Sequence, residues 1–277
     1  MKNSLSYIFC LFSALSLDVA LGATSSAYFA FTVCYQHEIN HAHFLTLFFS
    51  ILFFYSADHL YDLYRTRYTE RSERRSFHAS LRTVFIILAI VSFTAILPLI
   101  FFLDLHVIYS GFILAVGVGI YFFIINTYNT NRYKDILVAL GYTLGIWIPV
   151  FSYQLSNFNY LFLLPTLLFF INTFITMLLY AFYDIQSDKE ECIESFFSRF
   201  SVLQAERIVQ WAVLINAAIS LLLLSLTSFS FLLPLFLHAL LLVLITFFAR
   251  LNPTKVRWIG EYSYVIYFIW AVISVSF

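Results

Sequence analysis

Residues 160–188, YLFLLPTLLFFINTFITMLLYAFYDIQSD, form a long and mainly apolar run that ends in two aspartates, Asp184 and Asp188. A helix of about 20 apolar residues is long enough to cross the hydrocarbon core of a bilayer. Side chains four residues apart lie on the same face of a helix. The stretch therefore predicts a membrane-spanning helix whose end presents two carboxylates in the same direction.

The rest of the chain repeats this apolar pattern. Of its 277 residues, 62% are hydrophobic and 11% are charged, and the mean hydropathy of +0.88 excludes a water-soluble globular domain. We expect an all-α fold, a polytopic membrane bundle of about nine transmembrane helices that forms a single domain over residues 1–277. The predicted spans are residues 6–34, 44–62, 83–103, 107–126, 136–155, 160–183, 207–227, 230–249 and 258–276.

A second aspartate pair, Asp58 and Asp62, closes the predicted span 44–62 with the same four-residue spacing. Carboxylates on one helix face repel each other, and a divalent cation would remove that repulsion. Oxygen-only ligands suit Mg²⁺, so we predict that Asp58, Asp62, Asp184 and Asp188 are catalytic Mg²⁺ ligands. Solvated carboxylates at the membrane interface are the alternative interpretation of either pair alone.

The basic residues predict the orientation. With the N-terminus inside, the nine spans place all 15 Lys and Arg residues on the cytoplasmic side, where such residues concentrate. We therefore expect a multi-pass protein of the plasma membrane with its N-terminus and both aspartate pairs facing the cytoplasm. The lipid bilayer is the expected partner, whereas the formal net charge of +0 gives no support for nucleic acid, and no obligate protein partner is evident.

The first span has an alternative interpretation. Lys2, the apolar stretch 7–17 and the small residues at 20–23 together resemble a signal peptide. The apolar character continues to Val33, which favours a membrane span.

A polar stripe runs along the predicted span 160–183, where Asn172, Thr176 and Tyr180 precede Asp184 at four-residue intervals. Such a stripe should face the interior of the bundle, because polar groups turned towards lipid would stay unsatisfied. We predict that Asn172 and Tyr180 contact a substrate there. Hydrogen bonding between helices is the alternative for Asn172 and Thr176.

Three segments resemble the UbiA superfamily of intramembrane prenyltransferases. The stretch from Tyr180 looks like the second aspartate motif of that family and reads YAFYDIQSDKEECIES. The stretch from Ala57 looks like a degenerate version of the first motif and reads ADHLYDLYRTRY. NTYNTNRYKDILVALGYTLGIWIP, from Asn126, is similar to the family's connection between spans 4 and 5. Only the second motif is specific.

The resemblance implies a Mg²⁺-dependent enzyme that transfers a prenyl group from an allylic (poly)prenyl diphosphate to an aromatic or other lipophilic acceptor. Metal ions and basic groups would stabilise the charge on the leaving diphosphate. The candidate diphosphate contacts are Arg65, Arg132, Lys134 and Lys189, although the charge bias of cytoplasmic loops also explains most basic residues here. Tyr61 is a further candidate pocket residue on a motif helix.

The first motif departs from the family pattern NDxxDxxxD. Asp58 stands in the Asn place, His59 replaces the first Asp, and Thr66 stands where the last Asp belongs, while Cys192 replaces the usual Gly of the second motif. These departures leave open a weakened enzyme, a terpene cyclase, or a protein that binds a polyprenyl lipid without turning it over.

A rival motif lies between the first two predicted spans, where His37, Glu38 and His41 spell HExxH and His43 follows. In zinc proteases the two histidines of this motif bind zinc from one helical face and the glutamate acts as a general base. A membrane zinc protease is therefore a remote alternative. Surface-exposed histidines are the simpler interpretation.

Overall fold

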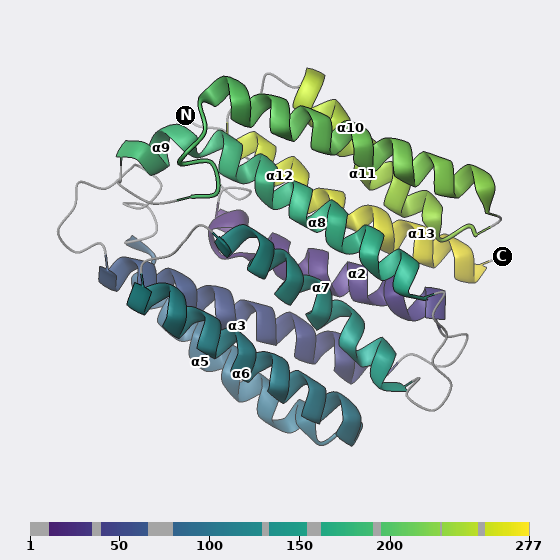
Figure 1. The fold of residues 1–277 in the computed structure, drawn as a ribbon. Helices are drawn as coiled ribbons and strands as arrows, with labels where there is room; N and C mark the ends of the chain where they lie inside the picture. The colour runs from purple at the N-terminus through teal and green to yellow at the C-terminus, as the bar shows by residue number, and fades with distance from the viewer. Residues whose placement is uncertain are drawn as a thin grey trace, which may run out of the picture.

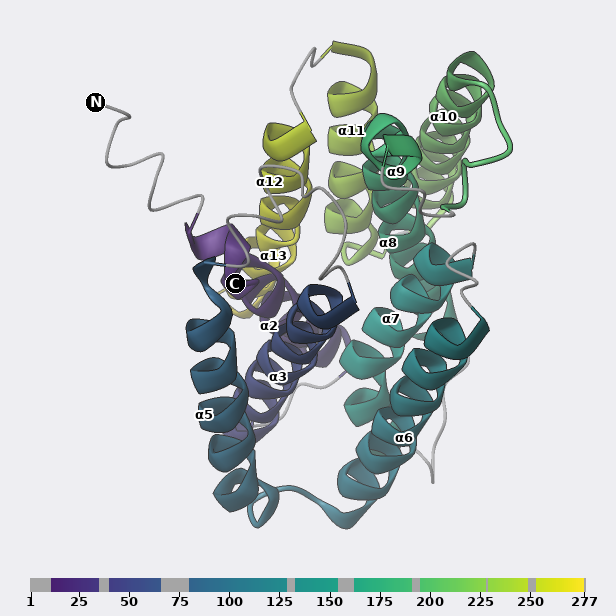
Figure 2. The same cartoon turned by 90° about the vertical axis from the view of Figure 1, so that its left-hand side faces the viewer.

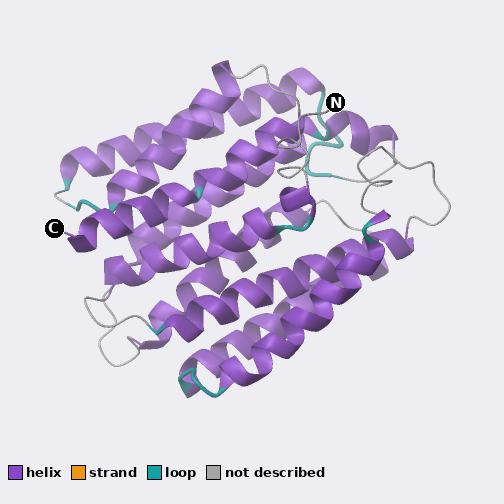
Figure 3. Cartoon of the chain, turned by 180° about the vertical axis from the view of Figure 1, so that it is seen from behind, coloured by secondary structure: helices purple, strands orange, loops and turns teal. Residues whose placement is uncertain are grey.

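The protein forms a bundle of helices and no strands within the parts of the chain that the structure, a computed structural model, describes (Figures 1 and 3). The described residues are 11–34, 40–65, 80–128, 133–153, 162–190, 195–227, 229–248 and 253–276. The helices in the first half are α2 (Leu17–Cys34), α3 (His41–Arg65), α5 (Arg82–Ile100), α6 (Leu105–Tyr128) and α7 (Lys134–Tyr153). Those in the second half are α8 (Leu163–Tyr183), α9 (Ile185–Glu190), α10 (Val202–Leu226), α11 (Leu232–Phe248), α12 (Pro253–Ser263) and α13 (Val265–Ser276).

Seven helical segments are long and apolar enough to cross a membrane, and two shorter apolar segments accompany them. The seven segments are Leu17–Cys34, His41–Tyr61, Arg82–Ile100, Lys134–Ser152, Leu163–Tyr183, Val202–Leu226 and Lys255–Val275, and the shorter two are Leu105–Tyr121 and Leu232–Phe248. Each predicted span overlaps one of these segments. The prediction of an all-α, multi-pass membrane bundle is therefore confirmed, while the count of nine crossings stays a prediction.

Consecutive long helices run in opposite directions, so their ends gather at two poles (Figure 1). One pole holds the ends of α3 and α8 and the starts of α7 and α12, and Figure 2 looks onto it. The described Lys and Arg residues all belong to this pole: Arg65, Arg82, Lys134, Lys189, Arg199, Arg207, Lys255 and Arg257. The segregation of positive charge predicted from the sequence is thus a property of the fold.

Helix α8 lies in the middle of the bundle and contributes to both buried apolar clusters. One cluster joins α8 to α2, α7 and α13 through Phe29, Trp147, Phe169 and Tyr267. The other joins α8 to α10 and α11 through Leu179, Val209 and Leu242. The polar stripe on α8 is therefore held between helices, and Asn172, Thr176 and Tyr180 are all buried, as predicted.

Two local breaks shape the charged pole. Ser16 has a φ of 55°, so the chain turns sharply between a helical turn at residues 11–14 and the start of α2. At the other break, Asp184 N–H donates to Tyr180 O (3.0 Å) and Asp188 N–H donates to Asp184 O (2.8 Å). These bonds carry helical geometry from α8 into α9, so Asp184 and Asp188 keep the four-residue register that the sequence predicts.

Candidate functional site

Asp58 lies near the end of α3 and reaches across to the start of α7. Its Oδ2 lies 3.9 Å from Lys134 Nζ, and 22% of the Asp58 side chain is exposed. A partly exposed pair at this distance contributes little to stability. The contact shows that the end of α3 and the start of α7 lie next to each other.

Asp184 is also paired with a cation, although the sequence motifs did not predict this partner. Arg257, on α12, donates from Nη2 to Asp184 Oδ2, and its guanidinium carbon lies 5.1 Å from the centre of the Tyr180 ring. The Tyr180 hydroxyl donates to the backbone oxygen of Arg257 at 3.3 Å. Arg257 thereby contacts the C-terminal end of α8 through both its side chain and its backbone oxygen.

Asp135 connects the two halves of the site. This half-buried residue in the first turn of α7 interacts electrostatically with its neighbour Lys134, with Arg257, and with both Asp184 and Asp188. Four carboxylates and two cations from α3, α7, α8, α9 and α12 therefore gather at one pole. We call Asp58, Asp135, Asp184, Asp188, Lys134 and Arg257 the charged cluster.

The remaining predicted site residues, which include the Mg²⁺ ligand Asp62, are only partly placed. Asp62 and Arg65 belong to the last turns of α3, and Lys189 follows Asp188 in α9, where it is exposed. Arg132 lies outside the described residues. Tyr61, the proposed pocket residue, has 36% of its surface exposed.

His59 is not among the residues of the charged cluster. Its Nε2 lies 3.2 Å from Ser16 Oγ, and its ring packs on Phe85 at 4.8 Å between centroids. His59 occupies the position of the first Asp in the motif of the resembled family. Its contacts are at the starts of α2 and α5. The charged cluster is built without it.

The Asn172 side chain forms hydrogen bonds with residues of three other helices. Its Nδ2 donates to Leu235 O (3.0 Å) and to the Tyr267 hydroxyl (3.3 Å), and its Oδ1 accepts from Asn216 Nδ2 (2.6 Å). The Tyr267 hydroxyl continues to His238 Nδ1 (2.8 Å). The amide is completely buried, and this geometry is the interhelical bonding that the sequence left open as an alternative for this residue.

The zinc-protease motif is placed only in part. His37 and Glu38 lie outside the described residues, and His41 is exposed at the start of α3. His43 is buried, with Nδ1 3.3 Å from Asn40 O and its ring beside Phe31. Within the described ranges, no three His, Cys, Asp or Glu side chains are grouped closely enough to hold a metal ion by themselves.

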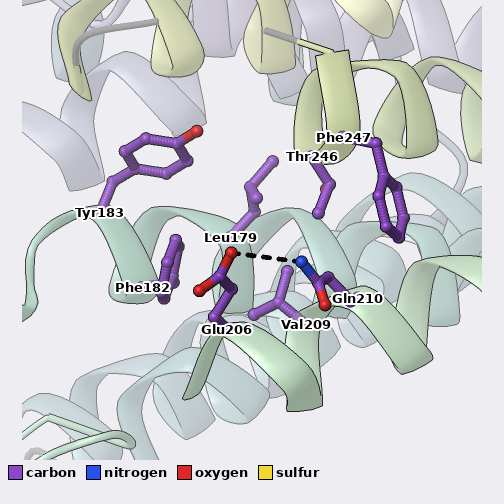
Figure 4. A pocket seen from close by; sticks show the side chains of 8 residues that line it. All are labelled: Leu179, Phe182, Tyr183, Glu206, Val209, Gln210, Thr246 and Phe247. Atoms are coloured by element: carbon purple, nitrogen blue, oxygen red, sulfur yellow. Dashed lines mark hydrogen bonds between the residues drawn. The ribbon is translucent and has the colours of Figure 1, made fainter. Parts of the chain in front are cut away.

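A separate cavity of about 270 Å³ opens between α8, α10 and α11 (Figure 4). Its lining is mixed polar and apolar, and it includes one hydrogen-bonded pair, in which Gln210 Nε2 donates to Glu206 Oε1 at 3.2 Å. The lining residues are Leu179, Phe182, Tyr183, Glu206, Val209, Gln210, Thr246 and Phe247. None of the predicted site residues is among them.

The sequence motifs do not include two buried acids. Asp18, on α2, is 3% exposed, and Glu261, on α12, is 9% exposed. The signal that marks them is their position, because each is an ionisable residue inside a predicted span, where such residues are rare. Asp135 carries the same signal at the edge of its span.

Comparisons of the chain with protein-family models, with curated proteins and with solved structures found no match.

Proposed function

We propose that the protein is an integral membrane prenyltransferase, an alkyl-group transferase of the UbiA type, that takes its prenyl group from an allylic (poly)prenyl diphosphate. The observation that carries this proposal is the charged cluster, in which Asp58 and Asp184, from motifs remote in sequence, gather around Lys134, Asp135 and Arg257. Carboxylates and cations interleaved at one pole suit a ligand that brings both phosphate groups and divalent metal.

The donor set fits Mg²⁺ in its chemistry. The cluster offers carboxylate oxygens and no thiolate or imidazole, and Mg²⁺ is commonly bound by one or two carboxylates while substrate phosphates and waters supply its other ligands. Asp184 and Asp188, together with Asp58 and Asp62, would hold it. When bound, Mg²⁺ would neutralise charge on the diphosphate and polarise its bond to the prenyl carbon.

The charges of the chain itself explain why a metal is needed. Carboxylates outnumber cations in the charged cluster, so a diphosphate anion arriving alone would be repelled. Lys134 and Arg257 would turn from Asp58 and Asp184 to the phosphate oxygens, and Arg257 can bind these in a bidentate manner. The two basic groups would then stabilise the charge that develops as the diphosphate leaves.

The position at the bundle pole suits an amphiphilic substrate. A polyprenyl diphosphate keeps its chain in the hydrocarbon and its headgroup at the interface, which is where the ends of membrane helices lie. The positive-inside rule places this pole at the cytoplasmic face, with the plasma membrane as the proposed location. The acceptor would be an aromatic or other lipophilic molecule within the bilayer.

The test is diphosphate release by the purified protein in lipid nanodiscs. With geranyl, farnesyl or geranylgeranyl diphosphate we expect release that depends on Mg²⁺, and we expect Asp184→Asn to abolish it. Asp104→Asn is the matched control, because Asp104 is an exposed carboxylate between α5 and α6 at the opposite pole. If folded protein releases nothing from any chain length, the proposal is wrong.

A second candidate is a polyprenyl-lipid-binding protein without turnover. It is favoured by His59, which packs on Ser16 and Phe85 where the resembled family supplies a carboxylate. Binding of the diphosphate without release would support it. Release without any acceptor, accompanied by a cyclic hydrocarbon, would instead indicate a terpene cyclase, and stoichiometric zinc lost in His37→Ala would indicate the protease.

A further inference from the structure

The cavity between α8, α10 and α11 lies at the charged pole, close to the ends of its three helices (Figure 4). Tyr183 is the last residue of α8, and Phe247 is the last but one of α11. Glu206 follows the start of α10 at Val202 by one helical turn, which is about 6 Å along the helix axis. A ligand in this cavity would therefore lie near the boundary between the hydrocarbon and the headgroups of the membrane.

The cavity has room for part of a molecule. Its volume of about 270 Å³ far exceeds the roughly 30 Å³ that one water molecule occupies in the liquid. It falls just below the range of pockets for whole drug-sized ligands, which begins at about 300 Å³. The space therefore suits a small headgroup and not a complete lipid or coenzyme.

A carboxylate without a paired cation forms part of the wall. Glu206 and Gln210 extend from α10 into the cavity, and Gln210 Nε2 donates to Glu206 Oε1 at 3.2 Å (Figure 4). Within the described ranges, no Lys or Arg forms an ion pair with Glu206. The amide is a neutral donor and leaves the charge of the carboxylate in place, whereas a cationic ligand would balance it.

Thr246, on α11, adds a second acceptor. Its hydroxyl donates to Leu242 O at 2.8 Å, within its own helix, so the oxygen can only accept a hydrogen bond from a ligand. An ionised carboxylate such as that of Glu206 also only accepts. A ligand that satisfies both groups must bring donors, and the charge of Glu206 favours a positively charged donor.

Aromatic rings supply much of the remaining wall. Phe182 and Tyr183 come from α8 and Phe247 from α11. In Figure 4, Phe182 and Phe247 stand on opposite sides of the pair formed by Glu206 and Gln210. Aromatic faces attract ammonium groups electrostatically. Together with the two acceptors, the rings match an alkylammonium group.

We propose that this cavity, lined by the eight residues given above and here called the amine pocket, binds the primary ammonium headgroup of an aminolipid. A primary ammonium brings three N–H donors for Glu206 and Thr246, whereas a quaternary ammonium brings none. The position among membrane helices favours a lipid over a free amine. Phe247 is 43% exposed, so an alkyl chain can lie against it, and Arg207, exposed next to Glu206 in the sequence, offers a cation for the lipid phosphate.

Native mass spectrometry of the detergent-purified protein tests the ligand class. We expect dioleoyl phosphatidylethanolamine to bind about tenfold more tightly than its N-acetyl derivative, which keeps the chains and the phosphate but loses the positive charge. Dioleoyl phosphatidylcholine keeps the charge without N–H donors and should also bind more weakly. Free ethanolamine at the concentration of the lipid should displace none of it. Binding of either analogue as tightly as phosphatidylethanolamine, or displacement by ethanolamine, would overturn the proposal.

Two pairs of variants locate the site. Glu206→Gln should abolish the tenfold preference, whereas Asp104→Asn, at the opposite pole, should keep it. Phe247→Ala should weaken the binding of phosphatidylethanolamine several-fold. Phe248→Ala removes the neighbouring ring, which does not line the cavity, and should have little effect. A preference that is unchanged in Glu206→Gln would show that the lipid binds elsewhere and that water alone fills the cavity.

Thermal unfolding of the wild-type protein guards against misfolded variants. A ligand that binds only the folded state raises the unfolding midpoint, so phosphatidylethanolamine should raise it more than an equal concentration of the N-acetyl derivative. Equal shifts would overturn the proposal without any variant. The amine pocket is tested apart from prenyl transfer, because Asp184→Asn should abolish diphosphate release and leave the lipid preference intact.

Discussion

Arg257 is the cation that connects α12 to the end of α8. It pairs with Asp184, and its guanidinium carbon lies 5.1 Å from the centre of the Tyr180 ring. A guanidinium can hold both contacts because it is planar and presents donors in a fork, whereas an ammonium is a single point charge. The same residue therefore adds a positive charge to the charged cluster and contacts Tyr180, one helical turn before Asp184.

We expect Arg257→Gln to weaken binding of a non-hydrolysable prenyl diphosphate analogue by about tenfold or more, because a charge-assisted contact is lost. Lys255→Gln removes an equal charge from an exposed position of the same helix and should change the affinity much less. Affinities measured at one Mg²⁺ concentration in nanodiscs decide between these outcomes. Equal effects of the two substitutions would mean that only the overall positive charge of the pole matters.

For a single residue such as Asn172, the sequence predicts the position in the bundle but not the hydrogen-bond partner. Its four-residue spacing correctly places it inside the bundle, but spacing carries no information about whether a substrate or another helix occupies the amide. Asp18 and Glu261 were missed for the opposite reason. They belong to no repeated pattern, and only their presence within apolar stretches distinguishes them.

We expect Asn172→Leu to destabilise the folded protein by about 2 kcal/mol, since the amides and hydroxyls it leaves behind are buried without partners. The change in unfolding midpoint in mixed detergent micelles measures this effect. Thr94→Val is the control, because Thr94 is exposed on α5 and its hydroxyl bonds only to carbonyls of its own helix. A destabilisation no larger than that of the control would show that the network adds nothing to stability.

At the scale of elements, hydropathy located the helices but not their breaks. The last predicted span, 258–276, is built from two helices, α12 and α13, with a turn at Tyr264. Hydropathy is averaged over many side chains, so it does not detect a local change in backbone direction. This break matters for the site because α12 alone carries Arg257, Gly260 and Glu261, and it is the helix that Tyr180 touches.

Gly260 permits that contact. A Cβ at this position would overlap the Tyr180 hydroxyl and lie 2.9 Å from two of its ring carbons, so Gly260→Ala forces α12 and α8 apart. We expect a loss of about 2 kcal/mol in unfolding free energy. Gly141→Ala, in α7, meets no atom within 4 Å and should stabilise by about 0.5–1 kcal/mol, because alanine favours a helix. Thermal unfolding in detergent separates the two, and equal effects would show that Tyr180 moves aside at no cost.

For the whole molecule, the strongest sequence prediction was the segregation of charge, and the fold supports it through helix direction alone. The alternating directions of the apolar helices bring the ends of α3 and α8 to the same pole as the starts of α7 and α12. Residues 58, 134, 184 and 257 thus meet although more than 40 residues separate each from the next. Their pairing partners were not predictable, because Lys134–Asp58 and Arg257–Asp184 depend on how neighbouring helices tilt and rotate.

The orientation of this pole is decided by labelling single cysteines. In a chain whose Cys10, Cys34 and Cys192 are changed to Ser, Lys189→Cys should react with a membrane-impermeant maleimide only after the cytoplasmic face of the membrane is exposed. Asp104→Cys, at the exposed turn between α5 and α6, should react from the outer face in intact cells. Since consecutive helices alternate in direction, labelling of both positions from one face would contradict the membrane crossing by α6, α7 and α8. Labelling with the two faces exchanged would place the charged cluster outside the cytoplasm, where the positive-inside rule argues against it.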